Sequence, residues 1–197
     1  TLWNTYAFFV LYANIDNFNP MEHKLEYDKL QTLDRWILSK LASLTKFVDE
    51  SLESYKLTEP GRAMQDFVDA LSNWYIRRSR ERFWGKGMPQ DKINAYMTLY
   101  TVLETVIRLA APFTPFITEE IYSNIVKKVN PRSPESVHMC DYPAYREEWV
   151  DKELEKNMDT LLDIVVEGRA ARNDANIKNR QPIGRMFVKA PIRLPDM

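Results

Sequence analysis

The residues in this sequence best suited to chemistry are arginines grouped around one tryptophan. Residues 77–86 hold five cations against a single acid, Glu81. If this segment is helical, Arg77, Arg80 and Trp84 follow Asn73 at spacings of four, three and four residues and share one face. Guanidinium groups bind phosphates through paired hydrogen bonds, and a flat ring stacks on an unpaired base. The spacing therefore predicts an interface for single-stranded nucleic acid.

A second basic run lies between residues 169 and 185, where Asp174 is the one acid among five cations. The whole chain has 27 basic and 28 acidic residues, so a polyanion must be bound by such local patches. Arginines near a helix end are also favoured by the helix dipole alone and often stay solvated. Composition leaves both interpretations open. The cations of the two runs are Arg77, Arg78, Arg80, Arg82 and Lys86, then Arg169, Arg172, Lys178, Arg180 and Arg185.

Two of the arginines fall on an apolar stripe. At helical spacing, the stripe through Phe67, Leu71 and Trp74 continues into Arg78 and Arg82. A buried charge needs a partner, so we expect both arginines to face inward and to pair with acids of neighbouring helices. Arg77, Arg80 and Trp84 would then remain free for RNA. A second apolar stripe also continues into polar residues. It runs through Leu154, Met158, Leu161 and Val165 and is followed by Arg169, Arg172 and Asn176.

Catalytic and metal-binding alternatives are poorly supported. Glu135 and His138 have the spacing of a di-iron ligand pair, but prolines flank them and no second copy exists. His138 and Cys140 fall short of the four ligands of a closed zinc site. We therefore expect no catalytic residue, no metal and no cofactor in this chain. One cysteine, Cys140, cannot form an internal disulfide, and no run of about 20 apolar residues could span a membrane, so we expect a cytoplasmic protein.

The elements that must position these residues are helices. A hydrophobic share of 45% with only 5 glycines predicts an all-α helical bundle. Periodicity predicts a helix buried on all sides in the opening run to residue 16, and further helices at about 32–55, 58–84, 91–111, from 115 onward and 147–178. We expect a loop at 130–145 with an extended piece at 137–140, and a strand at 186–190. These elements predict a bundle over 1–180 and the start of a truncated following domain at 181–197.

Four stretches, in order, resemble one known family. Residues 71–84 (LSNWYIRRSRERFW) resemble the helix of the anticodon-binding domain in class I aminoacyl-tRNA synthetases of the isoleucyl, valyl and leucyl group. Residues 2–16 resemble the helix that leaves the catalytic core of those enzymes. Residues 109–122 (LAAPFTPFITEEIY) are similar to their Ala-Pro-x-x-Pro-Phe turn and helix, and residues 170–183 to the junction after the bundle.

The resemblance implies a function. The Asn-Ile-Lys-x-Arg-Gln-Pro ending of residues 176–182 favours the isoleucyl branch, with the valyl and leucyl branches as alternatives. The chain would bind the anticodon stem-loop of an isoleucine-accepting tRNA, next to its own catalytic domain. That domain would use ATP with magnesium, but its two nucleotide-binding signatures are missing here, so the chain alone should not activate an amino acid. A helical protein-interaction scaffold is the alternative from another class. The candidate tRNA-binding residues are Asn73, Arg77, Arg78, Arg80, Arg82, Trp84, Lys86, Arg169, Arg172, Lys178 and Arg180.

Overall fold

The computed structural model describes residues 1–189 and divides the chain into two compact units. The first is Thr1–Val150, and the second begins at Asp151. The described residues form helices and turns without any strand, which confirms the predicted all-α class. The predicted strand is therefore wrong over residues 186–189, and Ala190 lies outside the described residues. The division at Asp151 does not coincide with the predicted boundary at residue 180.

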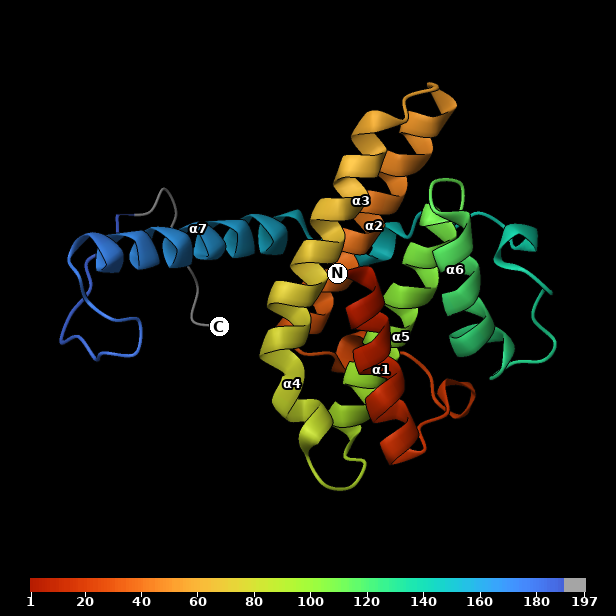
Figure 1. The fold of residues 1–197 in the computed structure, drawn as a ribbon, viewed down its shortest axis with the longest axis horizontal. Helices are drawn as coiled ribbons and strands as arrows, with labels where there is room; N and C mark the ends of the chain where they lie inside the picture. The colour runs from red at the N-terminus through yellow and green to blue at the C-terminus, as the bar shows by residue number, and fades with distance from the viewer. Residues whose placement is uncertain (190–197) are drawn as a thin grey trace. The chain divides into compact units, whose positions relative to one another are not determined.

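Helices of the first unit surround α5 (Figure 1). α5 packs against α1, α2, α4 and α6, while α2 and α3 form an antiparallel pair. The helices are α1 Leu2–Asp16, α2 Thr32–Glu53, α3 Thr58–Ala70, α4 Arg77–Trp84, α5 Gln90–Ala110 and α6 Pro115–Tyr122, with π-helical segments η3 Leu71–Ile76 and η4 Ser123–Lys127. Short 3-10 turns lie at η1 Pro20–Glu22, η2 Tyr27–Lys29, η5 Val137–Met139 and η6 Glu147–Trp149. The predicted helices at 32–55 and 91–111 are confirmed as α2 and α5.

The predicted helix at 58–84 is one continuous run of α3, η3 and α4, but it contains a π-helical turn. From Phe67 onward, one series of its buried residues recurs every four positions, at Phe67, Leu71, Tyr75, Ser79 and Phe83, and Ile76 is buried beside this series. In an α-helix each such step overshoots one turn by about 40°, so four steps would rotate the series about 160° away from the core. The wider π turn takes up this excess rotation. It therefore keeps Phe83 on the same face as Phe67.

Two other expectations, for residues 137–140 and 147–178, are corrected. The predicted extended piece at 137–140 is the 3-10 turn η5, because Ser136 accepts a hydrogen bond from the amide of His138 and curls the chain. The predicted helix at 147–178 is the shorter α7, Lys152–Asp174. Asp151 caps its start by accepting from the amide of Leu154 at 2.8 Å, and Asn176 in the left-handed region follows its end.

The first helix is not buried on all sides. Tyr6 and Phe9 of α1 face the core, but Trp3, Leu11 and Ile15 are about half exposed among the described residues. The sequence could not separate these two faces, because both are apolar. No helix among residues 1–189 has the length and apolar character needed to cross a membrane.

Candidate nucleic-acid interface

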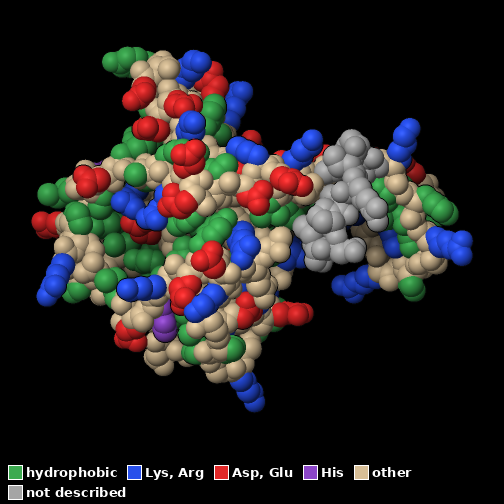
Figure 2. All heavy atoms as spheres, turned by 180° about the vertical axis from the view of Figure 1, so that it is seen from behind, with side chains coloured by type: hydrophobic (Ala, Val, Ile, Leu, Met, Phe, Trp, Pro, Cys, Tyr) green, Lys and Arg blue, Asp and Glu red, His purple; other side chains and the backbone are tan. Residues whose placement is uncertain are grey.

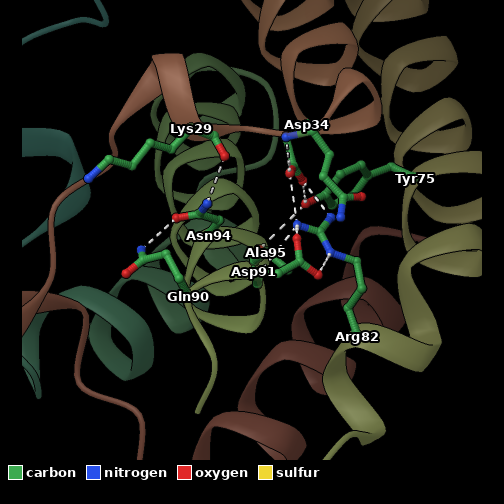
Figure 3. A network of polar contacts seen from close by, with 9 residues as sticks. Lys29, Asp34, Tyr75, Arg82, Gln90, Asp91, Asn94 and Ala95 are labelled. Carbon is green, nitrogen blue, oxygen red and sulfur yellow. Dashed lines mark hydrogen bonds and ion pairs between the residues drawn. The ribbon is translucent and has the colours of Figure 1, made fainter. Parts of the chain in front are cut away.

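The end of α4 is fixed by a polar cluster around Arg82 (Figure 3). The guanidinium makes two parallel hydrogen bonds of 2.8 Å to the carboxylate of Asp34, which is fully buried. On its other side it donates to both carboxylate oxygens of Asp91, at 2.8 and 2.9 Å. The hydroxyl of Tyr75 donates to Asp34 at 2.7 Å. Arg82 is thus enclosed by two acids from α2 and α5, and it binds these helices to α4.

The charges of this cluster are mutually stabilised. Asp34 lies in the first turn of α2, where it also accepts from the backbone amide of Gln31 at 3.2 Å. Burial alone would lower the pKa of Arg82, but its hydrogen bonds to Asp34 and the charge of that carboxylate outweigh burial and raise it. Burial, and next the charge of Asp34, raise the pKa of Tyr75 well above 10. At neutral pH the cluster therefore holds a charged arginine, and Tyr75 is a neutral hydrogen-bond donor.

Arg77, Arg80 and Trp84 stand on the outside of this fixed helix. All three are exposed, and 56% of the Trp84 surface is open to solvent. At about 100° per residue, the three side chains fall within about 60° of one another around the axis of α4. Within residues 1–189, neither arginine has an ion pair or side-chain hydrogen bond, and the Trp84 ring contacts no other aromatic ring. We call these three residues the outer track; its exposure agrees with the sequence-based expectation.

Arg78 was expected to face inward with Arg82, and this expectation is wrong. The π turn uses one more residue than an α turn, so the buried position that follows Leu71 is Tyr75 and not Trp74. Ile76 and Ser79 are the next buried residues, and Arg78 between them is exposed. It lies about 100° around the axis from Arg77, on the flank away from the outer track.

Two further candidates, Asn73 and Lys86, are exposed and lie close to the outer track in the sequence. Asn73 lies on η3, one helical turn before Arg77. Lys86 lies in the turn between α4 and α5, where Gly87 has a φ of 73° that favours glycine. Arg82, in contrast, is saturated by its two carboxylates. It supports the surface and is not free to bind a phosphate.

The second basic run belongs to the second unit. Arg172 is engaged there, since its Nη1 donates to the carbonyls of Lys178 at 3.1 Å and Gln181 at 2.8 Å. It therefore holds the turn that follows α7. Arg169, Lys178 and Arg180 are exposed, so three of the four candidates in this run present their cations to solvent among the described residues.

Sequence patterns did not predict which acids would pair with Arg82. Asp34 and Asp91 carry no local signal for Arg82, because Asp34 precedes it by 48 residues. Lys92 was missed as well: its ammonium is buried beside Asp16 at 2.6 Å and donates to the carbonyl of Gly85 at 2.7 Å. The capping position of Asp34 was the only local hint that its side chain is held in a defined place.

Charge over the remaining surface is mixed. Figure 2 shows acidic and basic side chains interspersed over the larger unit on the face that it presents. Among the described residues no group of three histidine, cysteine or acidic side chains is arranged to hold a metal ion. A polyanion would therefore be attracted to local groups such as the outer track rather than to a uniformly positive face.

Comparison with known proteins gives consistent matches. The family model described as the anticodon-binding domain of tRNA ligase matches residues 34–187. The isoleucine–tRNA ligase of Clostridium tetani is 54% identical over 188 residues, which is 95% of this chain and 18% of that protein. The enzyme of the same name from Clostridium novyi is 53% identical over 196 residues, and that from Bacteroides fragilis strain YCH46 is 48% identical over 184. The chain spans less than a fifth of the length of these relatives.

Proposed function

The chain belongs to the family of anticodon-binding domains of tRNA ligases, and we propose that its outer track, together with Asn73 and Lys86, binds the anticodon stem-loop of a tRNA. Arg77 and Arg80 would contact phosphates, and Trp84 would stack on an unpaired loop base. Arg78 would add a weaker contact from the neighbouring flank. Arg169, Lys178 and Arg180 of the second unit would meet further phosphates.

One observation carries this proposal: two arginines that have no acidic partner within residues 1–189 and an exposed tryptophan share one flank of a helix whose own end is fixed. Solvent-exposed cations without acidic partners are free to displace counterions from phosphates. Large aromatic side chains are usually at least partly covered in a folded domain, and an indole open over 56% of its surface has a face to offer. If the domain were a protein-interaction scaffold, the same arginines would need an acidic protein partner. The matched family of anticodon-binding domains favours RNA as the partner instead.

For the whole protein, we propose the attachment of isoleucine to its tRNA. The named relatives are isoleucine–tRNA ligases, which favours that amino acid over valine or leucine. ATP and Mg²⁺ would be used by a catalytic domain outside this chain, to which this domain would be joined, and the protein would work in the cytoplasm. The present chain would supply RNA binding and no chemistry, so isoleucine-dependent pyrophosphate exchange by the chain alone should stay at background.

Titration with an anticodon stem-loop RNA tests the proposal. Each phosphate contact on a single strand lowers the slope of log K against log salt by about 0.7. We expect a slope near −2 if about three cations engage phosphates. An isoleucine-accepting stem-loop should compete better than one of equal length with a scrambled loop. Binding that ignores salt concentration would contradict the proposal.

A further inference from the structure

The tryptophan of the outer track stands on a segment whose backbone is anchored at every neighbouring residue. We propose that Lys92 is a positioning residue for RNA binding: its buried ammonium fixes the end of α4 and so holds Trp84 ready to stack on a base. The inference rests on the function proposed above for Trp84. It assigns a role to a lysine that would itself touch no RNA.

Lys92 is an unusual lysine because its side chain is 2% exposed. Its ammonium lies 2.6 Å from Oδ2 of Asp16, at the end of α1, and donates to the carbonyl of Gly85 at 2.7 Å. The hydroxyl of Tyr96 donates to the same Asp16 oxygen at 2.5 Å. Lys92 thus links α1 and α5 to the residue that directly follows α4.

Trp84 lies between anchored neighbours. Phe83, on its N-terminal side, is 1% exposed and packs edge-on against Phe8 and Tyr96, with ring centroids 5.2 and 4.9 Å away. Gly85, on its C-terminal side, is held through its carbonyl by Lys92, and its amide donates to the carbonyl of Glu81 at 3.2 Å. Together with the enclosed guanidinium of Arg82, these contacts fix the backbone on both sides of Trp84 while its ring stays exposed.

A fixed backbone matters for stacking. Ordering a side chain on binding costs free energy and so lowers the affinity for RNA. A side chain that is already ordered in the free protein carries no such cost. The Gly85–Gly87 turn contains two glycines, and glycine leaves a chain more freedom than any other residue. Without the bond from Lys92 to Gly85, this turn would loosen directly beside Trp84. A buried ammonium is costly to maintain, and fixing the turn accounts for its position.

A double-mutant cycle of Lys92 and Trp84, with all variants made in the full-length chain, tests this role. Lys92→Met keeps the length of the side chain and removes the ammonium. We expect it to weaken binding of the anticodon stem-loop about two- to tenfold, the range for ordering one side chain. In a Trp84→Ala background the same change should alter affinity by less than about twofold, because the residue that Lys92 positions is gone. A purely structural role would produce the same loss in both backgrounds.

Arg108→Met is the matched control. It removes a cation from the same helix, where Arg108 pairs with Glu104 at 2.8 Å, and that pair involves no residue of α4. We expect its stem-loop affinity to stay within about twofold of the original chain, as for a site without shared partners. An equal loss in Lys92→Met and Arg108→Met would overturn the proposal.

A milder variant and a measurement without mutation cover the case in which Lys92→Met does not fold. Asp16→Asn weakens the hold on the ammonium and should give a smaller loss that again vanishes in the Trp84→Ala background. In the original chain, the Gly85 amide should exchange with solvent more slowly than the Gly87 amide, and an unprotected Gly85 amide would overturn the proposal.

If Trp84→Ala leaves affinity unchanged, the RNA surface and the role of Lys92 both fail. If Trp84→Ala weakens binding and Lys92→Met or Asp16→Asn does not, only the role of Lys92 fails.

Discussion

The guanidinium of Arg82 and the carboxylate of Asp34 face each other across two parallel hydrogen bonds of 2.8 Å, although 48 residues separate them in the chain. This pair joins the N-terminal turn of α2 to the last turns of α4, and Asp91 completes the enclosure from α5. The outer track is presented on the opposite side of the same helix. One side of α4 therefore holds the helix in the bundle through Arg82, and the other side presents the proposed RNA-binding residues.

Removal of the guanidinium should cost mainly stability. Arg82→Met leaves the fully buried Asp34 carboxylate with Tyr75 as its remaining side-chain donor, so we expect the free energy of unfolding to fall by about 3–5 kcal/mol. Urea unfolding followed by circular dichroism measures this change. Arg78→Ala is the control, and it should stay within about 0.5 kcal/mol because Arg78 is exposed. Equal destabilisation by the two variants would show that Arg78 is a structural residue after all.

Trp84→Ala should separate affinity from stability. We expect stem-loop binding to weaken by about 1–3 kcal/mol if a base stacks on the ring. The melting temperature should hardly change, because the ring contacts no other aromatic ring within residues 1–189 and is 56% exposed. Trp84→Phe should restore part of the lost affinity, since a smaller flat ring remains. A lower melting temperature with unchanged affinity would instead make Trp84 a cover for the helix end.

Alkaline pH should destabilise the first unit. Burial, and next the charge of Asp34, raise the pKa of Tyr75 well above 10, and burial followed by Glu104 raises the pKa of Tyr100 to about 12. The unfolded chain releases these protons near pH 10, whereas the folded chain retains them. This contribution to stability is complete below about pH 10 and is lost as the pH rises toward the folded values.

Urea midpoints between about pH 8 and pH 11.5 measure this decline. Tyr75→Phe removes one of the retained protons, so its midpoint should fall less steeply above pH 10 than that of the original chain. The variant should start lower at neutral pH, because it loses the hydrogen bond to Asp34. Parallel declines in the two proteins would show that Tyr75 titrates normally in the fold.

Local sequence patterns predicted much of this structure and failed where distant residues meet. The periods of α2 and α5 were sufficient because their buried faces repeat at ordinary helical spacing. The π turn was not predictable in the same way, since a buried residue every four positions suits either a drifting α-helix or a corrected one. Without the π turn, the stripe was continued from Leu71 to Trp74 instead of Tyr75, which wrongly placed Arg78 inward. The outer track was found because exposure, helical spacing and side-chain chemistry are all local properties.

Long-range polar partners left no comparable signal. Lys92 reads as an ordinary lysine in the first turn of a helix, and only the fold brings Asp16 and the Gly85 carbonyl to its ammonium. The early end of α7 was missed for the opposite reason. Its helical period gives no stop signal before Pro182, whereas the left-handed Asn176 ends the helix just after Asp174.

The role of the outer track is tested most directly by two double variants with the same change in charge. Arg77→Ala combined with Arg80→Ala removes two cations of the track, whereas Lys56→Ala combined with Arg132→Ala removes two exposed cations elsewhere in the first unit. The first pair should weaken binding of the anticodon stem-loop by about 2 kcal/mol or more and make the salt slope shallower by about 1.4, the value for two lost contacts to a single strand. The second pair should leave both quantities nearly unchanged. Equal losses in the two double variants would mean that the RNA responds only to net charge and that the outer track is not its binding surface.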